Sequence, residues 1–165
     1  MGEAVNAELK VTDINGDPFQ EDREPAATIM PVGPNELRAW LFAEPYLKKA
    51  LEHTDEWDIR DVASQYCAGK VGIVLCLNKE RTPFGALCIE VMDYPKKRIL
   101  QVHLFGADDH SDELWMLYIW PQLQDLARQF GCASIMGTGR DGWVRKLKAK
   151  HRYLWEVGLY PGQEN

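Results

Sequence analysis

The chain has little that would tie it to a membrane, a nucleic acid or a metal ion. No apolar run approaches the roughly 20 residues that span a bilayer, and nothing resembles a signal peptide. The formal net charge of −6 opposes general binding to DNA, RNA or anionic lipid. His53, His103 and His151 are dispersed without HxxxH spacing, so we expect each on the surface or satisfied in the core. We therefore expect no nucleic-acid partner, no membrane and no metal, and a protein kept in a cytoplasm unless it is packaged into something larger.

Cysteine is also sparse, and its four copies form no CxxC pair. All four lie in apolar segments, so we expect reduced cysteines in the core. Cys76 and Cys88 fall on strands that we expect to pair, which leaves a disulfide between them open. A reducing compartment would disfavour that disulfide.

The composition indicates one folded domain with a charged arm. At 165 residues and 45% apolar content, the chain is long enough to bury a core. Residues 1–25 are strongly acidic, and we expect an arm there that is either partly disordered or docked on a partner, followed by a domain over residues 26–165. Basic residues gather near the other end. They are Arg140, Arg145, Lys146, Lys148, Lys150 and Arg152.

Hydrophobic patterning predicts alternating strands and helices. The links between the three middle strands are short, so these strands should form an antiparallel meander. The order indicates an α/β fold, with a mixed, mostly antiparallel sheet flanked by helices. The expected strands cover residues 26–32, 71–77, 85–92, 99–105, 132–136 and 153–159.

The helices carry recognisable start and stop signals. A first helical segment runs from Pro34 to Leu51, and Pro45 should divide it in two. Asp58 can cap the next helix, which Gly69 should end. A long helix is predicted over residues 112–130, interrupted or restarted at Pro121, and a basic helix over residues 141–150.

Two segments near the C-terminus carry a recognisable motif. Residues 127–132 read Ala-Arg-Gln-Phe-Gly-Cys, and residues 139–147 read Gly-Arg-Asp-Gly-Trp-Val-Arg-Lys-Leu. Together with the order of elements, they resemble the GNAT N-acetyltransferase fold. More narrowly, they resemble the GNAT-like proteins of tailed bacteriophages. The resemblance covers about residues 26–159.

This resemblance implies a cofactor site and a reaction. In the family's working enzymes, acetyl-CoA binds between two splayed parallel strands, here residues 99–105 and 132–136. A substrate amine attacks the thioester, a carboxylate or water removes a proton, and often a Tyr protonates the departing thiolate. Glu90, on the middle strand of the meander, is then a candidate base, although strand alternation would turn it to solvent. Leu147 lies near where the Tyr is expected, which leaves Tyr153 as a candidate.

The turn that should bind the pyrophosphate differs from the family's (R/Q)xxGx(G/A) pattern. Residues 106–113 hold one glycine, no Arg or Gln, and the carboxylates of Asp108, Asp109, Asp112 and Glu113. A carboxylate about 6 Å from a phosphate costs on the order of 3 kcal/mol at an effective dielectric near 20. A helix N-terminus returns only about 0.3–1 kcal/mol. These acids suit a capped, solvated helix start instead.

We therefore expect a noncatalytic GNAT-fold phage protein, a pseudoenzyme without a cofactor. It would act through protein contacts as a virion component, an assembly factor or a binder of a host protein. The alternative is an acetyl-CoA-dependent N-acetyltransferase with a divergent CoA-binding loop, in which Gly137, Gly139, Arg140 and Lys146 contact the cofactor. A metal-dependent enzyme that uses the oxygen ligands of the acidic loop is a third, weaker option.

Protein contacts have candidate residues of their own. Six tryptophans are more than a small core can hide, so some should be exposed anchors. The basic C-terminal helix is either a solvated face or a site for an acidic partner, for instance the arm of a second copy. Partners would be other phage or host proteins, or a second copy in a homo-oligomer. The candidate partner-binding residues are Trp143, Arg145, Lys148, Lys150 and Arg152.

Overall fold

A five-stranded sheet lies at the centre of the computed structural model, which describes residues 24–137 and 145–147. Its strand order is β1-β2-β3-β4-β5. The first three pairings are antiparallel and the last is parallel, as expected for a mixed sheet built on a meander. The strands are β1 (Ala27–Val32), β2 (Gly72–Asn78), β3 (Pro83–Tyr94), β4 (Lys97–Ala107) and β5 (Ser134–Gly137).

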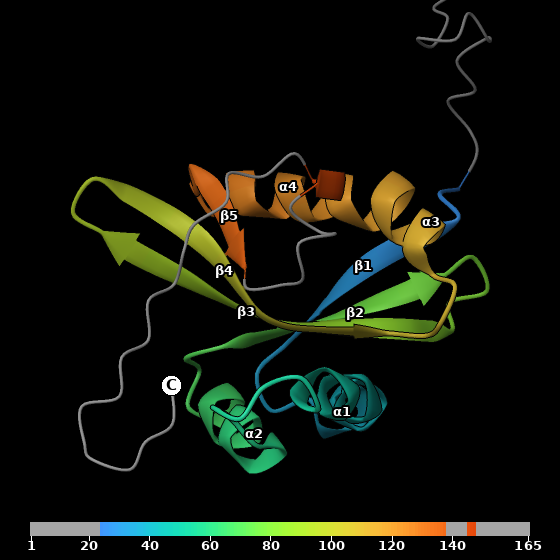
Figure 1. Ribbon diagram of the computed structural model, residues 1–165, viewed down its shortest axis with the longest axis horizontal. Helices are drawn as coiled ribbons and strands as arrows, with labels where there is room; N and C mark the ends of the chain where they lie inside the picture. Colours follow the sequence, from blue (N-terminus) through green and yellow to red (C-terminus); the bar gives the residue numbers. More distant parts are fainter. Residues whose placement is uncertain (1–23, 138–144, 148–165) are drawn as a thin grey trace, which may run out of the picture.

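Helices cover both faces of this sheet (Figure 1). One face carries α1 (Leu37–Leu51) and α2 (Ile59–Cys67). The other carries one long helix made of three parts, namely α3 (Asp112–Leu114), the π-helical turn η1 (Trp115–Ile119) and α4 (Trp120–Gln129). None of the described helices is long and apolar enough to cross a membrane.

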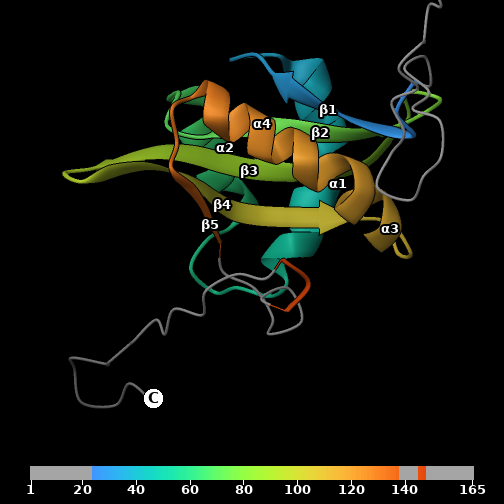
Figure 2. The ribbon, with the colours of Figure 1, turned by 90° about the horizontal axis from the view of Figure 1, so that it is seen from above.

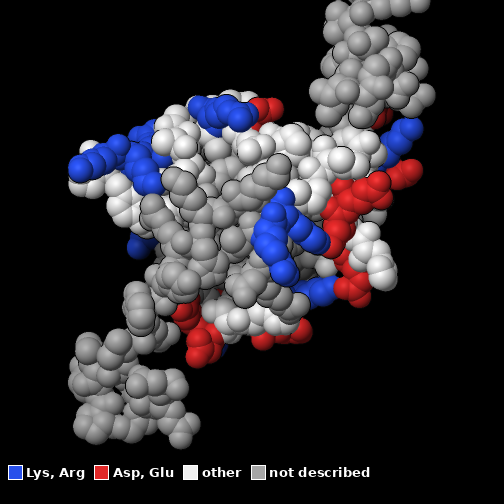
Figure 3. All heavy atoms as spheres, turned by 45° about the horizontal axis from the view of Figure 1, so that its top comes forward, with Lys and Arg blue, Asp and Glu red and all other residues white. Residues whose placement is uncertain are grey.

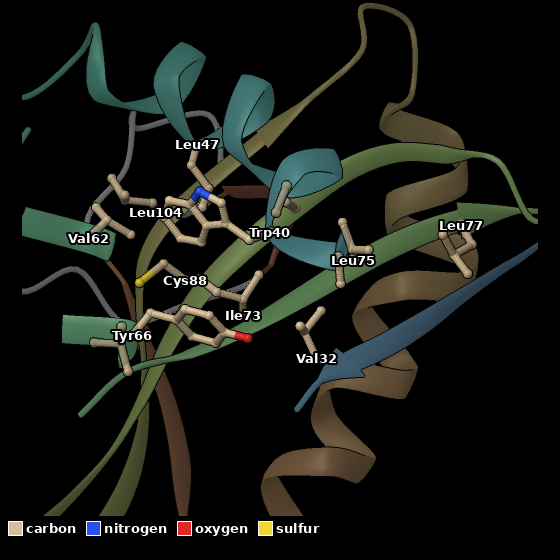
Figure 4. Packing of buried hydrophobic residues seen from close by; sticks show 14 residues of the cluster. Val32, Trp40, Leu47, Val62, Tyr66, Ile73, Leu75, Leu77, Cys88 and Leu104 are labelled. Atoms are coloured by element: carbon tan, nitrogen blue, oxygen red, sulfur yellow. The ribbon is translucent and has the colours of Figure 1, made fainter. Parts of the chain in front are cut away.

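Alternation along the strands builds a separate core on each face. In β2, Ile73 and Leu75 pack under α1 and α2, while Val74 and Cys76 pack under the long helix. Figure 4 shows the first of these cores, in which Leu47 is fully buried among side chains from the sheet. A central strand covered on both faces was predicted from its continuous apolar run, and the structure confirms it.

Two helix starts and stops follow the predicted signals. Asp58 caps α2, because its carboxylate accepts from the backbone N–H groups of Arg60 and Asp61. The Asp61 side chain accepts from the Asp58 N–H in return, which completes a capping box. Gly69 and Gly131 follow their helices with φ +72°, a conformation that glycine adopts without strain.

The two helical prolines behave differently from one another. Pro45 does not divide α1, which runs unbroken from Leu37 to Leu51, so that prediction was wrong. Its ring lies on the exposed side, where water can solvate the carbonyl that loses its N–H partner, while Leu47 and Ala43 bury the opposite side. Pro121 stands in the first turn of α4, directly after η1, so the predicted irregularity is present there.

The four cysteines match the predicted reduced, buried state only in part. All four are free, and Cys76 and Cys88 are buried as expected. Those two side chains lie in the cores of opposite faces, which prevents a disulfide between them. Cys67 is exposed at the end of α2, so the expectation of a buried thiol was wrong there. Because burial penalises the thiolate, it raises the pKa of both Cys76 and Cys88 to about 12.

Several predictions lie outside the described residues or differ at element ends. The strand predicted over residues 132–136 begins at Ser134 and is half-buried rather than buried, because it is the outermost described strand. The predicted strand 153–159, most of the acidic arm and most of the basic helix lie outside the described residues. The boundary between arm and domain stays a prediction.

Candidate active site

The parallel pairing of β4 with β5 covers only part of β4. The two strands pair over residues 99–102 of β4, and the last pair joins Val102 to Gly137 (Figure 2). β4 continues to Ala107 beyond that point. Within the described part of the chain, residues 103–107 therefore have a strand neighbour on the β3 side alone. The family resemblance in the sequence predicts acetyl-CoA between these two strands.

A β-bulge in β4 lies at the same point. Cys88 of β3 pairs with Leu104, whereas Ile89 pairs with Val102, so His103 is the extra residue. Such a bulge changes the direction in which a side chain points. Leu104 packs in the core beneath α1 and α2, and His103 stacks on Trp57 from the α1–α2 connection, with ring centroids 5.1 Å apart. Both side chains therefore lie on the same face of the sheet.

The bulge also brings His103 against Glu90. The His103 Nε2 atom lies 2.7 Å from Oε2 of Glu90 on β3. Their side chains are 22% and 32% exposed, so neither is a free surface group. An imidazole hydrogen-bonded to a carboxylate can take a proton from an approaching ammonium group, because the carboxylate stabilises the imidazolium that forms.

This pair was only half visible in the sequence. Glu90 was a candidate base with a solvent-facing alternative, and the structure places it partly buried beside an imidazole. His103 was expected on the surface or satisfied in the core, and the structure makes it partly buried and hydrogen-bonded to Glu90. The missing signal was the register of the hairpin, which sets Glu90 opposite Gln101 and leaves His103 two positions further on. The bulge itself has no sequence signature here.

The acidic turn, residues 108–113 between β4 and the long helix, forms the other end of the candidate site. Ser111 precedes α3 and is buried, and its hydroxyl donates to the Asp108 carbonyl oxygen rather than to a helix N–H. His110 has φ 64°, a left-handed conformation. The first N–H groups of a helix have no acceptor within the helix. The side chain of Ser111 does not cap the helix, whereas two of the expected acids, Asp112 and Glu113, stand in its first turn.

The carboxylates of the acidic turn are accompanied by lysines. Asp109 accepts from Lys49 Nζ at 2.9 Å, and Asp112 accepts from Lys146 Nζ at 2.6 Å. The hydrogen bond from Lys49 lowers the pKa of Asp109. In Figure 3, acidic and basic side chains lie side by side at this end of the molecule.

These pairings weaken the electrostatic case against a phosphate. The Asp109 and Asp112 side chains are 84% and 70% exposed, so water screens their charges. Each of the two carboxylates also has an ammonium group within hydrogen-bonding distance. The repulsion predicted from the sequence counted all four acids of the turn without these two lysine partners.

The other predicted site residues are only partly placed. Gly137 ends β5, Lys146 reaches the acidic turn, and Arg145 is exposed. Among the described residues, no group of three or more His, Cys, Asp or Glu is arranged to hold a metal ion. The remaining candidates lie outside the described residues and stay predictions. They are Gly139, Arg140, Trp143, Lys148, Lys150, Arg152 and Tyr153.

The described tryptophans do not supply exposed anchors. Trp40 and Trp115 are buried, and Trp57 and Trp120 are partly buried. Trp40 stacks on Tyr66, and Trp115 contacts Phe105, so both belong to the packing of the two cores.

No protein-family model matches the chain, and no curated protein matches it either. Solved structures do match. An aminoglycoside acetyltransferase from an uncultured soil metagenomic sample, in complex with sisomicin, has TM-score 0.60 at 11% identity, covering 84% of this chain and 97% of its own. The aminoglycoside N-acetyltransferase AAC(6')-Iy in complex with CoA has TM-score 0.56 at 12% identity, covering 84% and 99%. A Trypanosoma brucei acetyltransferase has TM-score 0.54 at 11% identity, covering 81% and 99%. The chain therefore has the GNAT acetyltransferase fold.

Proposed function

We propose that this chain is an acetyl-CoA-dependent N-acetyltransferase with a divergent phosphate-binding turn. The observation that carries the proposal is the Glu90–His103 pair, held at the bulge that directly follows the last described β4–β5 pair. The β4 edge beyond Val102 fits the cofactor, because its backbone groups can hydrogen-bond the amides of a pantetheine arm. Acetyl-CoA, when bound, supplies the thioester whose acetyl group is transferred.

The residues of the chain would act on the amine acceptor. An ammonium group must lose a proton before its nitrogen can attack, and Glu90 with His103 accepts that proton. The new C–N bond forms as the C–S bond breaks, and the thiolate then takes up a proton. Trp57 covers one face of the imidazole and keeps water from it. We assign no described residue as the group that donates a proton to the thiolate. Tyr153 stays the candidate predicted from the sequence.

Acetyl-CoA binding followed by acetyl transfer tests the proposal. Acetyl-CoA at millimolar concentration should raise the melting temperature, and incubation with a panel of amines should release free thiol. Aminoglycosides belong first in that panel, since two of the similar structures are aminoglycoside acetyltransferases. No thermal shift and no thiol release with any amine would refute the proposal.

A noncatalytic protein that acts through protein contacts is the second candidate, favoured by the acidic turn itself. The turn holds four carboxylates where working enzymes of the fold place glycines. The resemblance to tailed-phage proteins, a place in a virion or host cytoplasm, and partner contacts through Trp143 and Arg145 all stay predictions from the sequence. A stable complex with a phage or host protein, together with no response to acetyl-CoA, would support this candidate over the enzyme.

A further inference from the structure

The last turn of α1 lies directly against the end of β4. A Cβ added at Gly106 would overlap the carbonyl oxygen of Tyr46, so only glycine permits this approach. The Tyr46 hydroxyl donates to the Pro83 carbonyl oxygen at 2.9 Å, which fixes the helix on the neighbouring strand as well. Lys49 follows three residues after Tyr46 and is thereby brought to the acidic turn.

Lys49 is held at the foot of this turn by two hydrogen bonds. Its Nζ donates to the carbonyl oxygen of Ala107 at 3.0 Å and to Oδ1 of Asp109 at 2.9 Å. An ammonium group has three N–H donors. The bond to the Ala107 carbonyl oxygen holds the ammonium group in place. The bond to Asp109 joins two exposed side chains, 47% and 84% exposed, and such an exposed ion pair contributes little and can exchange partners.

We propose that Lys49 is a ligand of the acyl-CoA diphosphate, and that a phosphate oxygen replaces the Asp109 carboxylate on its Nζ. The inference rests on the proposed function and deepens it by naming a residue that recognises the cofactor. The turn has no Arg or Gln of its own, so a cation from α1 supplies what its sequence lacks. Lysine binds phosphate as a point charge and needs no special turn geometry.

Asp109 then has a defined role as a competitor for this cation. In the absence of cofactor its carboxylate neutralises the ammonium group, and on binding it must give way. Lys146, which pairs with Asp112 on the same turn, is placed to contribute a second positive charge. The substitution Asp109→Asn removes the competing charge and should therefore strengthen cofactor binding.

The neighbouring lysine provides a matched control. Lys48 also lies in the last turn of α1, but its Nζ pairs with Glu44 of the same helix at 2.8 Å. Substituting either lysine by alanine removes one exposed positive charge, so the difference between the two variants isolates contact with the diphosphate. Two probes separate the parts of the cofactor. Acetyl-CoA carries the diphosphate, and acetyl-pantetheine lacks it.

Calorimetry with these probes tests the inference. Lys49→Ala should weaken acetyl-CoA binding about tenfold, as expected for a hydrogen bond to a charged group, and leave acetyl-pantetheine binding unchanged. Lys48→Ala should change neither, and Asp109→Asn should tighten acetyl-CoA binding several-fold. Melting curves of each variant show whether it is folded.

The remaining outcomes distinguish failure of the Lys49 inference from failure of the proposed function. If the wild-type chain binds acetyl-CoA and Lys49→Ala binds it equally well, the inference is overturned and the proposed function stands. If Lys49→Ala weakens the binding of acetyl-CoA and acetyl-pantetheine equally, the lysine has a structural role and the inference is also overturned. If the wild-type chain binds neither probe, the proposed function fails and the inference fails with it.

Discussion

The two halves of β4 differ in how their backbone is paired. Residues 99–102 pair with strands on both sides, and Ile99 and Leu100 are fully buried. Residues 103–107 pair with β3 alone within the described chain and begin with a bulge. The first half pairs along both edges, whereas the second, among the described residues, pairs along one edge and places a histidine beside a carboxylate. One strand thus divides into a part paired on both edges and a part that carries the proposed site.

The first half should carry the larger share of stability. Leu100→Ala removes a fully buried side chain from the core under the long helix, which should lower the free energy of unfolding by about 2–5 kcal/mol. Denaturant unfolding measures this loss. Leu117→Ala, at a side chain 59% exposed, should stay within about 0.5 kcal/mol of the wild type. Equal effects of the two substitutions would remove the stability half of the comparison.

The second half should carry the activity. Glu90→Gln keeps the size of the side chain and removes its capacity to accept a proton, so kcat should fall about 100-fold. Acetyl-CoA binding and melting temperature should change little, because Glu90 packs in neither core. Steady-state kinetics measures the effect, with Glu80→Gln in the exposed β2–β3 turn as control. A variant with unchanged kcat would exclude Glu90 as part of the proton acceptor.

Thiol labelling gives a smaller, finer contrast. Cys67 is exposed and should react first with a thiol reagent at neutral pH, whereas Cys76 and Cys88 should react only on opening, since their pKa values are about 12. These raised values also make stability fall as pH rises from about 9 toward 12, because the unfolded thiols ionise first. Mass spectrometry of labelled peptides checks the order. Cys88 of β3 pairs with Leu104, the residue after the bulge in β4. Early labelling of Cys88 would therefore show that the second half of β4 separates easily from β3.

Much of the fold was predictable from local signals. The capping by Asp58, the stop at Gly69 and the apolar run of β2 all depend on nearby residues, and all were confirmed. The predicted break of α1 at Pro45 was wrong, because the effect of a proline depends on which side of the helix faces water, and that is a tertiary property. Propensity alone does not contain it.

The candidate site was less predictable, because its contacts join distant residues. Glu90 and His103 are 13 residues apart, and Lys49 and Asp109 are 60 apart. The sequence showed the acids of the turn but not the lysine that α1 delivers to them. A charge count along the chain therefore omits these lysines. The repulsion between the acidic turn and a phosphate has to be judged with the neighbours that the fold supplies.

Hydrogen exchange with and without acetyl-CoA tests the central claim most directly, since it reads both halves of β4 in one experiment. The account predicts that saturating acetyl-CoA slows exchange in residues 103–114 and leaves residues 99–102, already paired on both sides, nearly unchanged. Unchanged exchange throughout residues 103–114 at millimolar acetyl-CoA would contradict it.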